Sequence, residues 1–194
     1  MLSAASPSPV SADARSELHG MLMAQAGGFA NDDLFARMLA SQMQGMGALP
    51  PGLGLAQADF AVLLARHFPG FPAPAGRTLA DEDPSRGGER AELLTLLQAH
   101  CGGADASERW MAAIVAAACM GGDHLWQDLG LWSRGDLSGL MTRNFPALAA
   151  KNTRDMKWKK FLYKQLCDGE GVVVCRSPSC EVCADYAECF GPED

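Results

Sequence analysis

The sequence lacks a hydrophobic run that is long enough to cross a membrane. Its longest apolar stretch, WMAAIVAAACM at residues 110–120, falls well short of the ~20 residues that a membrane-spanning helix needs. The N-terminal MLSAASPSPVSADARS has neither the basic region nor the apolar segment of a secretory signal peptide. We therefore expect a cytoplasmic protein with no membrane partner, in which the thiols stay reduced.

Positive charge and familiar catalytic motifs are also lacking. Lysine and arginine number 16 against 23 acidic residues, which gives a net charge of −7. No global positive field would therefore attract a nucleic acid. The chain contains no Ser-His-Asp, P-loop or dinucleotide-binding motif. These absences argue against a nucleic-acid partner and against a conventional enzyme.

Alternating strand patterns are absent as well, and the apolar spacing is helical nearly throughout. We predict an all-α fold: a helical bundle of about seven helices with a C-terminal cysteine-rich metal-binding loop. The expected organisation is a disordered N-terminus at 1–12, a helical domain at 13–168 and a cluster-binding tail at 169–194, with a long loop at 69–87. Glycine, proline and capping residues place the helices at 13–26, 32–45 (capped by Asn31), 56–67, 88–100, 106–120, 134–144 and 153–167.

One internal similarity connects the two halves of the chain. DFAVLLARHFP at 59–69 and DLSGLMTRNFP at 136–146 share Asp, Leu, Arg, Phe and Pro in register. Both read as an amphipathic helix that is stopped by proline, with a phenylalanine beneath its end. Either coincidence in a common helix stop or the duplication of a helical unit explains the match.

Cysteine, in contrast, is concentrated at the end of the chain. Cys175, Cys180, Cys183 and Cys189 follow the spacing Cys-x4-Cys-x2-Cys-x5-Cys. Zinc sites usually show two short Cys-x2-Cys pairs across a longer gap, whereas this opening matches the start of the plant-type ferredoxin spacing. The spacing therefore favours an iron–sulfur type of centre over zinc. A redox dithiol at Cys180 and Cys183 would leave the other two thiols unexplained.

The helix expected at 153–167, capped by Asn152 or Thr153, leads into this tail. Trp158, Phe161, Leu162, Gln165 and Leu166 should form its buried face. Lys157, Lys160 and Lys164 form a separate basic stripe, which is either a solvated helix face or a docking site for an oxyanion such as molybdate or for an acidic partner. Cys167 follows on the same side, as a half-buried helix residue or a fifth metal ligand.

Among the other candidates, His124 is the most prominent. It follows two glycines in GGDHLWQDLGL, in a short helical turn, and is either a structural core histidine or a nitrogen ligand that completes a sulfur-rich metal site. His67 and His100 are expected to act as charges or caps at helix C-termini. Cys101 and Cys119 are interpreted as core residues.

With these residues taken together, the chain resembles the NifQ family. The family's tail spacing is present without departure at the four tail cysteines. The similarity continues through HLWQDLGL (124–131), LSGLMTRNFPALAAKN (137–152) and MKWKKFLYKQLC (156–167). GLGLAQADFAVLLARHFPG (52–70) carries it more weakly, so that roughly residues 50–194 are covered.

The resemblance implies a carrier rather than an enzyme. NifQ-like proteins hold a molybdenum–iron–sulfur cluster, thought to be of the Mo-3Fe-4S kind, or an iron–sulfur precursor that takes molybdenum from molybdate. They donate molybdenum to the NifH and NifEN machinery, which completes the iron–molybdenum cofactor of nitrogenase. On this reading Cys175, Cys180, Cys183 and Cys189 bind the cluster. The alternatives are an iron–sulfur electron-transfer protein and a zinc-stabilised interaction module.

Overall fold

The computed structural model describes residues 9–72, 87–169 and 189–190. Most of the expected N-terminal segment 1–12, of the loop 69–87 and of the tail 169–194 lies outside them. Within 9–169 the described residues are all-helical and include no strand, as predicted, and none of their helices is long and apolar enough to span a membrane. The elements are α1 (Pro9–Met23), α2 (Asp32–Met43), the 3-10 helix η1 (Pro51–Gly54), α3 (Gln57–His67), α4 (Gly87–Ala99), α5 (Glu108–Ala118), α6 (Leu125–Asp128), α7 (Arg134–Asn144), α8 (Pro146–Ala149) and α9 (Trp158–Gly169).

The expected helices are all present, and their ends differ by a few residues. The bounds of α7 are those predicted, whereas α1 begins four residues before the expected start of 13–26. α9 begins five residues later than the expected 153. The short helical turn expected after His124 is α6. Helix α8 was not expected, because it is a single turn that starts at the proline that ends α7.

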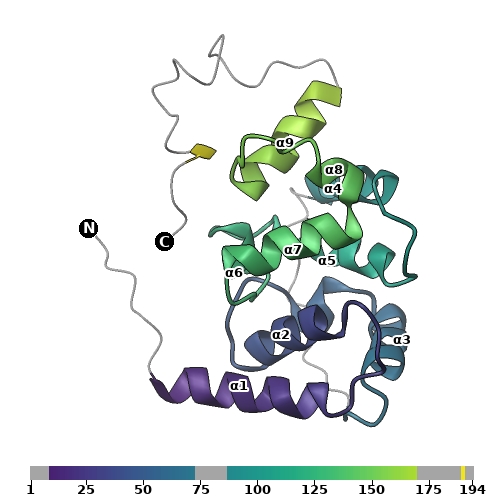
Figure 1. The fold of residues 1–194 in the computed structure, drawn as a ribbon, viewed down its shortest axis with the longest axis vertical. Coiled ribbons are helices and arrows are strands. Elements are labelled where there is room, and N and C mark those ends of the chain that lie inside the picture. The colour runs from purple at the N-terminus through teal and green to yellow at the C-terminus, as the bar shows by residue number, and fades with distance from the viewer. Residues whose placement is uncertain (1–8, 73–86, 170–188, 191–194) are drawn as a thin grey trace.

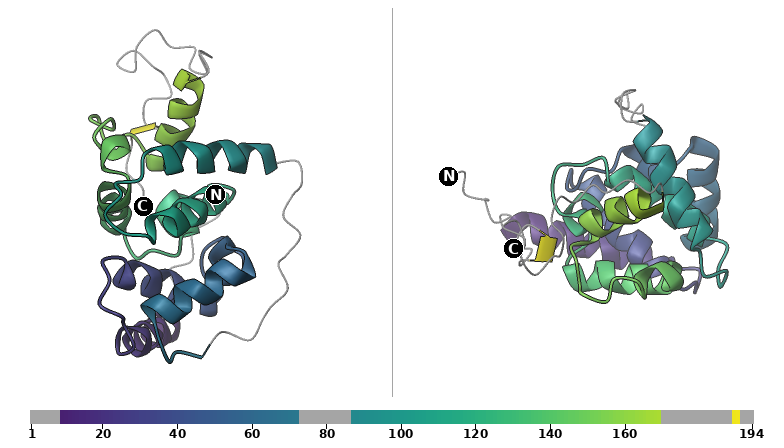
Figure 2. Two further views of the ribbon diagram at one scale, coloured as in Figure 1. Left: turned by 90° about the vertical axis from the view of Figure 1, so that its right-hand side faces the viewer. Right: turned by 90° about the horizontal axis from the view of Figure 1, so that it is seen from above.

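Helix α5 lies at the centre of the molecule, between α1–α3 on one side and α9 on the other (Figure 1). Nearly every residue from Trp110 to Ala118 is buried, since its many alanines allow neighbouring helices to approach from all sides. It packs against α4 and η1. Helices α1 and α9 lie at opposite ends of the long axis, and the side view separates them in the same way (Figure 2).

The similarity between 59–69 and 136–146 has a structural counterpart. The helices α3 and α7 both end at a phenylalanine with nearly the same backbone conformation: Phe68 has φ −138° and ψ 60°, and Phe145 has φ −132° and ψ 56°. The carbonyls before them accept matching hydrogen bonds. Gly27 N–H donates to His67 O at 2.8 Å, and Gly102 N–H donates to Asn144 O at 2.9 Å.

A second pair of segments repeats in the same order. Leu53-Gly54-Leu55 and Leu129-Gly130-Leu131 are all buried, and their glycines have φ of 73° and 69°, a left-handed conformation that glycine adopts without steric cost. The order α1–α2–η1–α3 therefore corresponds to α4–α5–α6–α7. These matches favour the duplication of a helical unit over coincidence.

Buried polar side chains join the two units. Asn31 Nδ2 donates to Asn144 Oδ1 at 2.7 Å and to Ser107 Oγ at 2.9 Å. The prediction that Asn31 caps α2 is therefore wrong in its detail: the residue has the N-cap position but makes no side-chain cap bond. Asp32 accepts the N–H groups of Gly28 and Phe29 instead, at 2.7 and 2.8 Å. The Asn31 amide is satisfied across the interface, where burial makes an unpaired polar group costly.

Candidate metal centre

Only one of the four predicted tail ligands is among the described residues. Cys175, Cys180 and Cys183 lie outside them, and Cys189 lies within. In the described part of the chain, no three His, Cys, Asp or Glu side chains are grouped in a way that could hold a metal ion. The four-cysteine site thus remains a prediction from the sequence. The structure shows the position of its last predicted ligand, Cys189.

Cys189 lies at the start of α9. The N–H of Lys157 donates to the Cys189 carbonyl at 2.8 Å, and the Arg154 guanidinium lies over the Phe190 ring, 5.3 Å from its centroid. Cys189 and Phe190 are both half-buried against the core. The chain therefore leaves α9 at its C-terminal end and is back at its N-terminal end by Cys189.

The segment that receives Cys189 is held in a defined turn. Asn152 Oδ1 accepts from Met156 N–H, and Asn152 Nδ2 donates to Met156 O, both at 2.9 Å. Asp155 has a φ of 53° and forms a two-pronged ion pair with Arg134, with N–O distances of 2.9 and 3.0 Å. The expected capping of a helix from 153 by Asn152 or Thr153 is wrong, because Asn152 closes this turn and the helix starts only at Trp158.

Lys159 holds a second segment at the same end of α9. Its Nζ donates to Gly121 O at 3.0 Å and to Asp123 O at 2.7 Å, and it forms a close ion pair with Asp128. Asp128 is only 2 % exposed, so its charge depends on this partner. A Cβ at Gly121 would lie 2.3 Å from Asp128 Oδ1, which explains the glycine. The sequence gives no signal for this role of Lys159, since an inward-pointing lysine does not alter the apolar periodicity.

His124 follows the residue whose carbonyl Lys159 binds. It occupies the N-cap position of α6, where its N–H donates to Gln127 Oε1 at 3.2 Å, and it is half-buried. Lys157 binds Cys189, and Lys159 binds the 121–128 loop, so His124 and Cys189 lie at the same end of α9. The structure thus places two of the residues that the sequence singled out at the same end of one helix.

Cys167 lies elsewhere. It is half-buried in the last turn of α9, ten residues beyond Lys157, which at a rise of 1.5 Å per residue is about 15 Å along the helix. Cys189 and Cys167 are therefore at opposite ends of α9. Cys119 is buried, as predicted, and Cys101 is half-buried against the core, where burial raises the pKa of its thiol.

The basic stripe is only partly a free surface. Lys160 and Lys164 are exposed, and Lys157 precedes the first residue of the helix and is half-buried. Lys164 pairs with Asp168 at 2.6 Å, one turn further along. The buried face is that predicted for Trp158, Phe161 and Leu162, while Gln165 and Leu166 are half-buried.

The two helix-end histidines have different roles. His100 Nδ1 donates to Leu96 O at 2.8 Å, which confirms the expected cap at the end of α4. His67 is not a surface charge or cap: it is fully buried, and its Nδ1 donates to Asp32 Oδ1 at 2.6 Å. Burial lowers the pKa of His67, and Asp32 only partly opposes this effect. The ring lies among the side chains of Phe29, Phe35, Phe68 and Trp110.

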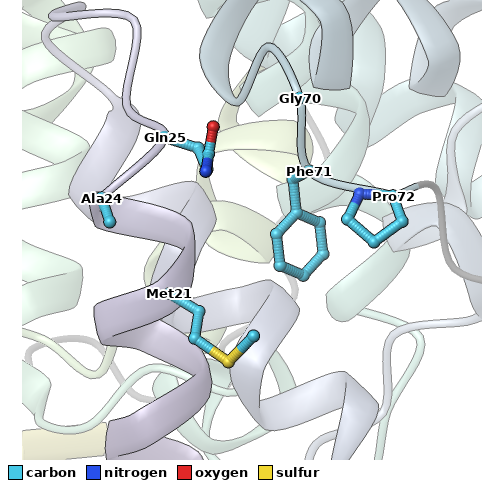
Figure 3. Close-up of a pocket in the computed structure, with 6 residues that line it drawn as sticks. All are labelled: Met21, Ala24, Gln25, Gly70, Phe71 and Pro72. Atoms are coloured by element: carbon cyan, nitrogen blue, oxygen red, sulfur yellow. The ribbon is translucent and has the colours of Figure 1, made fainter.

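One hollow, remote from α9, offers little chemistry. A space of about 250 Å³ lies between the end of α1 and residues 70–72. Met21 and Phe71 face it, with the amide of Gln25 above them (Figure 3). Gln25 is the one polar side chain among its six lining residues, and none of them is titratable. It lies at the opposite end of the molecule from the residues around Cys189.

Comparison with known proteins identifies the family. The NifQ family model matches residues 34–191. The chain belongs to the NifQ family. It is 46 % identical over 175 residues to protein NifQ of Azotobacter vinelandii, covering 84 % of this chain and 90 % of that protein. It is 40 % identical over 173 residues to protein NifQ of Rhodobacter capsulatus, covering 89 % and 92 %. Among solved structures, none matches significantly.

A third relative agrees with the first two. Protein NifQ of Klebsiella pneumoniae is 36 % identical over 165 residues, which cover 81 % of this chain and 97 % of that protein. Membership in the NifQ family implies a role in nitrogen fixation and in the biosynthesis of the iron–molybdenum cofactor. The family model extends past Cys189, so the matched region includes all four tail cysteines.

Proposed function

We propose that this chain is a carrier: it binds a molybdenum–iron–sulfur cluster through Cys175, Cys180, Cys183 and Cys189 and donates the molybdenum to the assembly of the iron–molybdenum cofactor. The observation that supports this most directly is the four-cysteine spacing within the matched NifQ region. Thiolates are the ligands that soft, sulfide-bridged metals prefer. The cargo is a cluster of the Mo-3Fe-4S type, or an iron–sulfur precursor loaded from molybdate, and the protein itself turns over no substrate.

The position of Cys189 attaches the proposed cluster site to the helical domain. Its backbone is bound by Lys157, so one thiol of the site belongs to the helical domain and not only to the tail. In the proposal His124, which lies at the same end of α9, is the replaceable ligand of the molybdenum corner, because an imidazole exchanges without breaking the set of four thiolates. Displacement of that ligand by a partner would release the metal.

The proposed recipients are the NifH and NifEN proteins of cofactor assembly. The exposed amine of Lys160 and the exposed Arg154 flank the segment that receives Cys189. They would offer positive charge to an acidic partner on an otherwise acidic molecule. Docking through this basic surface would orient the cluster toward the recipient.

A metal and sulfide count decides between the carrier and its alternatives. The full chain is purified without oxygen from cells supplied with molybdate, and iron, sulfide, molybdenum and zinc are measured. The carrier predicts iron, sulfide and molybdenum together, and loss of molybdenum on mixing with an acceptor. Iron and sulfide alone, with reversible redox cycling and no metal loss, would indicate electron transfer. One zinc per chain with no iron would indicate a zinc-stabilised module.

Single substitutions then assign the ligands. Each tail cysteine is changed to serine, and His124 to alanine, and the ratio of molybdenum to iron is measured. A ligand of the molybdenum corner lowers this ratio, whereas a ligand of iron reduces both metals. Cys101→Ser is the matched control, since Cys101 packs within the helical domain. The assignment fails if every variant loses both metals in equal proportion.

A further inference from the structure

Two arginines share one tryptophan on the face formed by α1, α2 and the start of α7. The guanidinium carbons of Arg15 and Arg37 each lie 4.8 Å from the centroid of the Trp132 ring, so that they are less than about 10 Å apart. His19 packs on the same ring at 5.1 Å. Guanidinium charges this close repel each other unless carboxylates neutralise them.

The carboxylates nearby are committed to Arg37 and His19. Asp33 binds Arg37 Nε and His19 Nε2, both at 2.8 Å. Asp136 binds Arg37 Nη1 at 3.3 Å and accepts the N–H of Trp132 at 3.1 Å. Arg15 has no carboxylate among the described residues, and its polar contact is with the sulfur of Met46 at 3.9 Å. Burial and repulsion from Arg37 accordingly lower the pKa of Arg15.

The internal duplication shows that the fold offers such an arginine a partner. Arg90 occupies the equivalent position in α4, twelve residues before the paired glycines in each unit. It reaches the other unit and donates to Gly54 O at 2.7 Å. The carbonyl that corresponds to it for Arg15 is that of Gly130, which is already bound by Ser41 Oγ at 2.6 Å. The hydrogen bond that Arg90 donates to a carbonyl of the other unit therefore has no equivalent at Arg15.

Two further donors in the stack have no acceptor. Arg15 Nε and Trp132 Nε1 are buried and have no hydrogen-bond partner in the described structure. Arg15 is held on the ring by its cation–π contact, and its terminal amines, of which Nη1 contacts the Met46 sulfur, are the donors left for a ligand. A planar guanidinium held on an aromatic face is well suited to an oxyanion, since several N–H groups bind it with little loss of side-chain entropy.

We propose that Arg15, positioned on Trp132 beside Arg37, forms a binding site for a small divalent oxyanion of tetrahedral shape. Molybdate and sulfate share that shape and charge. The choice of molybdate as the natural ligand rests on the proposed function of the chain. The site is built from α1, α2 and Trp132, which precedes α7, and it includes none of the tail cysteines. It would hold molybdate by charge and hydrogen bonds, before any sulfur ligation.

Equilibrium dialysis of the metal-free full-length protein with molybdate tests the site, with tryptophan fluorescence as a second readout. Arg15→Gln should weaken molybdate binding about tenfold or more, since it removes charge-assisted hydrogen bonds. Arg15→Lys keeps the charge and the helix but loses the planar fork, and should bind with intermediate affinity. Sulfate should compete with molybdate in the wild-type protein. If the site prefers molybdate, a large excess of sulfate will be needed to displace it.

The matched control is Arg109→Gln, which removes an exposed arginine that lies over another tryptophan, Trp110. This variant and Cys183→Ser should bind molybdate as the wild type does. The proposal is overturned if the wild type binds no molybdate, or if both Arg15 variants bind it with unchanged affinity. Either result leaves the iron, sulfide and molybdenum count of the anaerobic protein untouched, so the failure of this site is distinguishable from failure of the carrier function.

Discussion

At the residue scale, Lys159 connects two segments that are about 30 residues apart in the sequence. Its amine satisfies two backbone carbonyls and the buried carboxylate of Asp128 together. The same lysine lies two residues after Lys157, whose N–H binds Cys189. The segments beside the candidate metal centre are therefore held by a side chain that is not among its predicted ligands.

Replacing Lys159 should destabilise the fold and loosen the His124 loop. Lys159→Met leaves Asp128 as a buried charge without its partner, which costs about 3 kcal/mol when a buried pair is broken from one side. Urea unfolding measures the loss. Lys160→Met, on the exposed side of the same turn, should change the free energy of unfolding by less than about 0.5 kcal/mol. Equal effects of the two substitutions would contradict the role given to Lys159.

The buried pair of His67 and Asp32 makes stability depend on pH. The folded protein holds His67 neutral because burial lowers its pKa below 6.5, whereas the unfolded chain protonates it near that value. The contribution is therefore full above pH 6.5 and is lost as the pH falls through 6.5 toward the lower folded pKa. Urea unfolding between pH 5 and 8 should show this decline.

A variant that lacks His67 identifies the source of that decline. His67→Asn places in α3 the residue that α7 has at the equivalent position, Asn144, and should flatten the pH dependence between 5 and 7. Asp33 and Asp105, whose pKa values are lowered below 3.8, titrate outside this window. His100→Gln is the control, and a decline that persists in His67→Asn would rule out this origin.

At the element scale, α9 differs most from its predicted form. Its periodicity continues back to 153 in the sequence, and the helix still begins at Trp158, because Asn152 and Met156 close a turn that Asp155 enters with a positive φ. Arg134 from α7 holds this turn. The start of α9 therefore depends on the contact between Arg134 and Asp155, which are 21 positions apart. A local sequence pattern cannot contain such a contact.

Anchoring of Cys189 at this turn can be tested without the metal. Phe190→Ala removes the ring under Arg154 and the apolar contact with the core, and should free the Cys189 carbonyl from the N–H of Lys157. Hydrogen exchange at the Lys157 amide should then rise about tenfold, in line with the loss of one hydrogen bond. The melting temperature of the helical domain should change little. Unchanged exchange would show that Cys189 is not held there in solution.

At the scale of the whole molecule, two similar units bind each other through side chains that cross between them. Arg66 of α3 pairs with Asp105 at 3.0 Å, and Arg143 of α7 donates to Ala30 O at 2.7 Å. These arginines precede the Phe–Pro steps at equivalent positions, and each reaches the loop of the other unit. Together with Asn31 and Asn144, they make the contact reciprocal, like that of a symmetric dimer within one chain.

Two separate halves should therefore assemble. If the chain is cut within residues 73–86 and the two fragments are expressed together, we expect them to co-purify as a one-to-one complex. Asn144→Ala in the second fragment should weaken the complex by about 2 kcal/mol, because it leaves the buried Asn31 without its partner. Size-exclusion chromatography with a tag on one fragment measures this. Independent elution of wild-type fragments would show that the interface does not suffice.

The sequence determined the helical class, the positions of most helices and the buried face of α9, since these depend on apolar periodicity and local capping. It also determined the family, through the tail spacing and the segments beside it. Which polar residues become interior was decided only by tertiary structure. Lys159, His67 and Asn31 carry ordinary surface side chains, and each is paired with a residue from a distant segment. The cost of burying an unpaired polar group is imposed only when those segments meet.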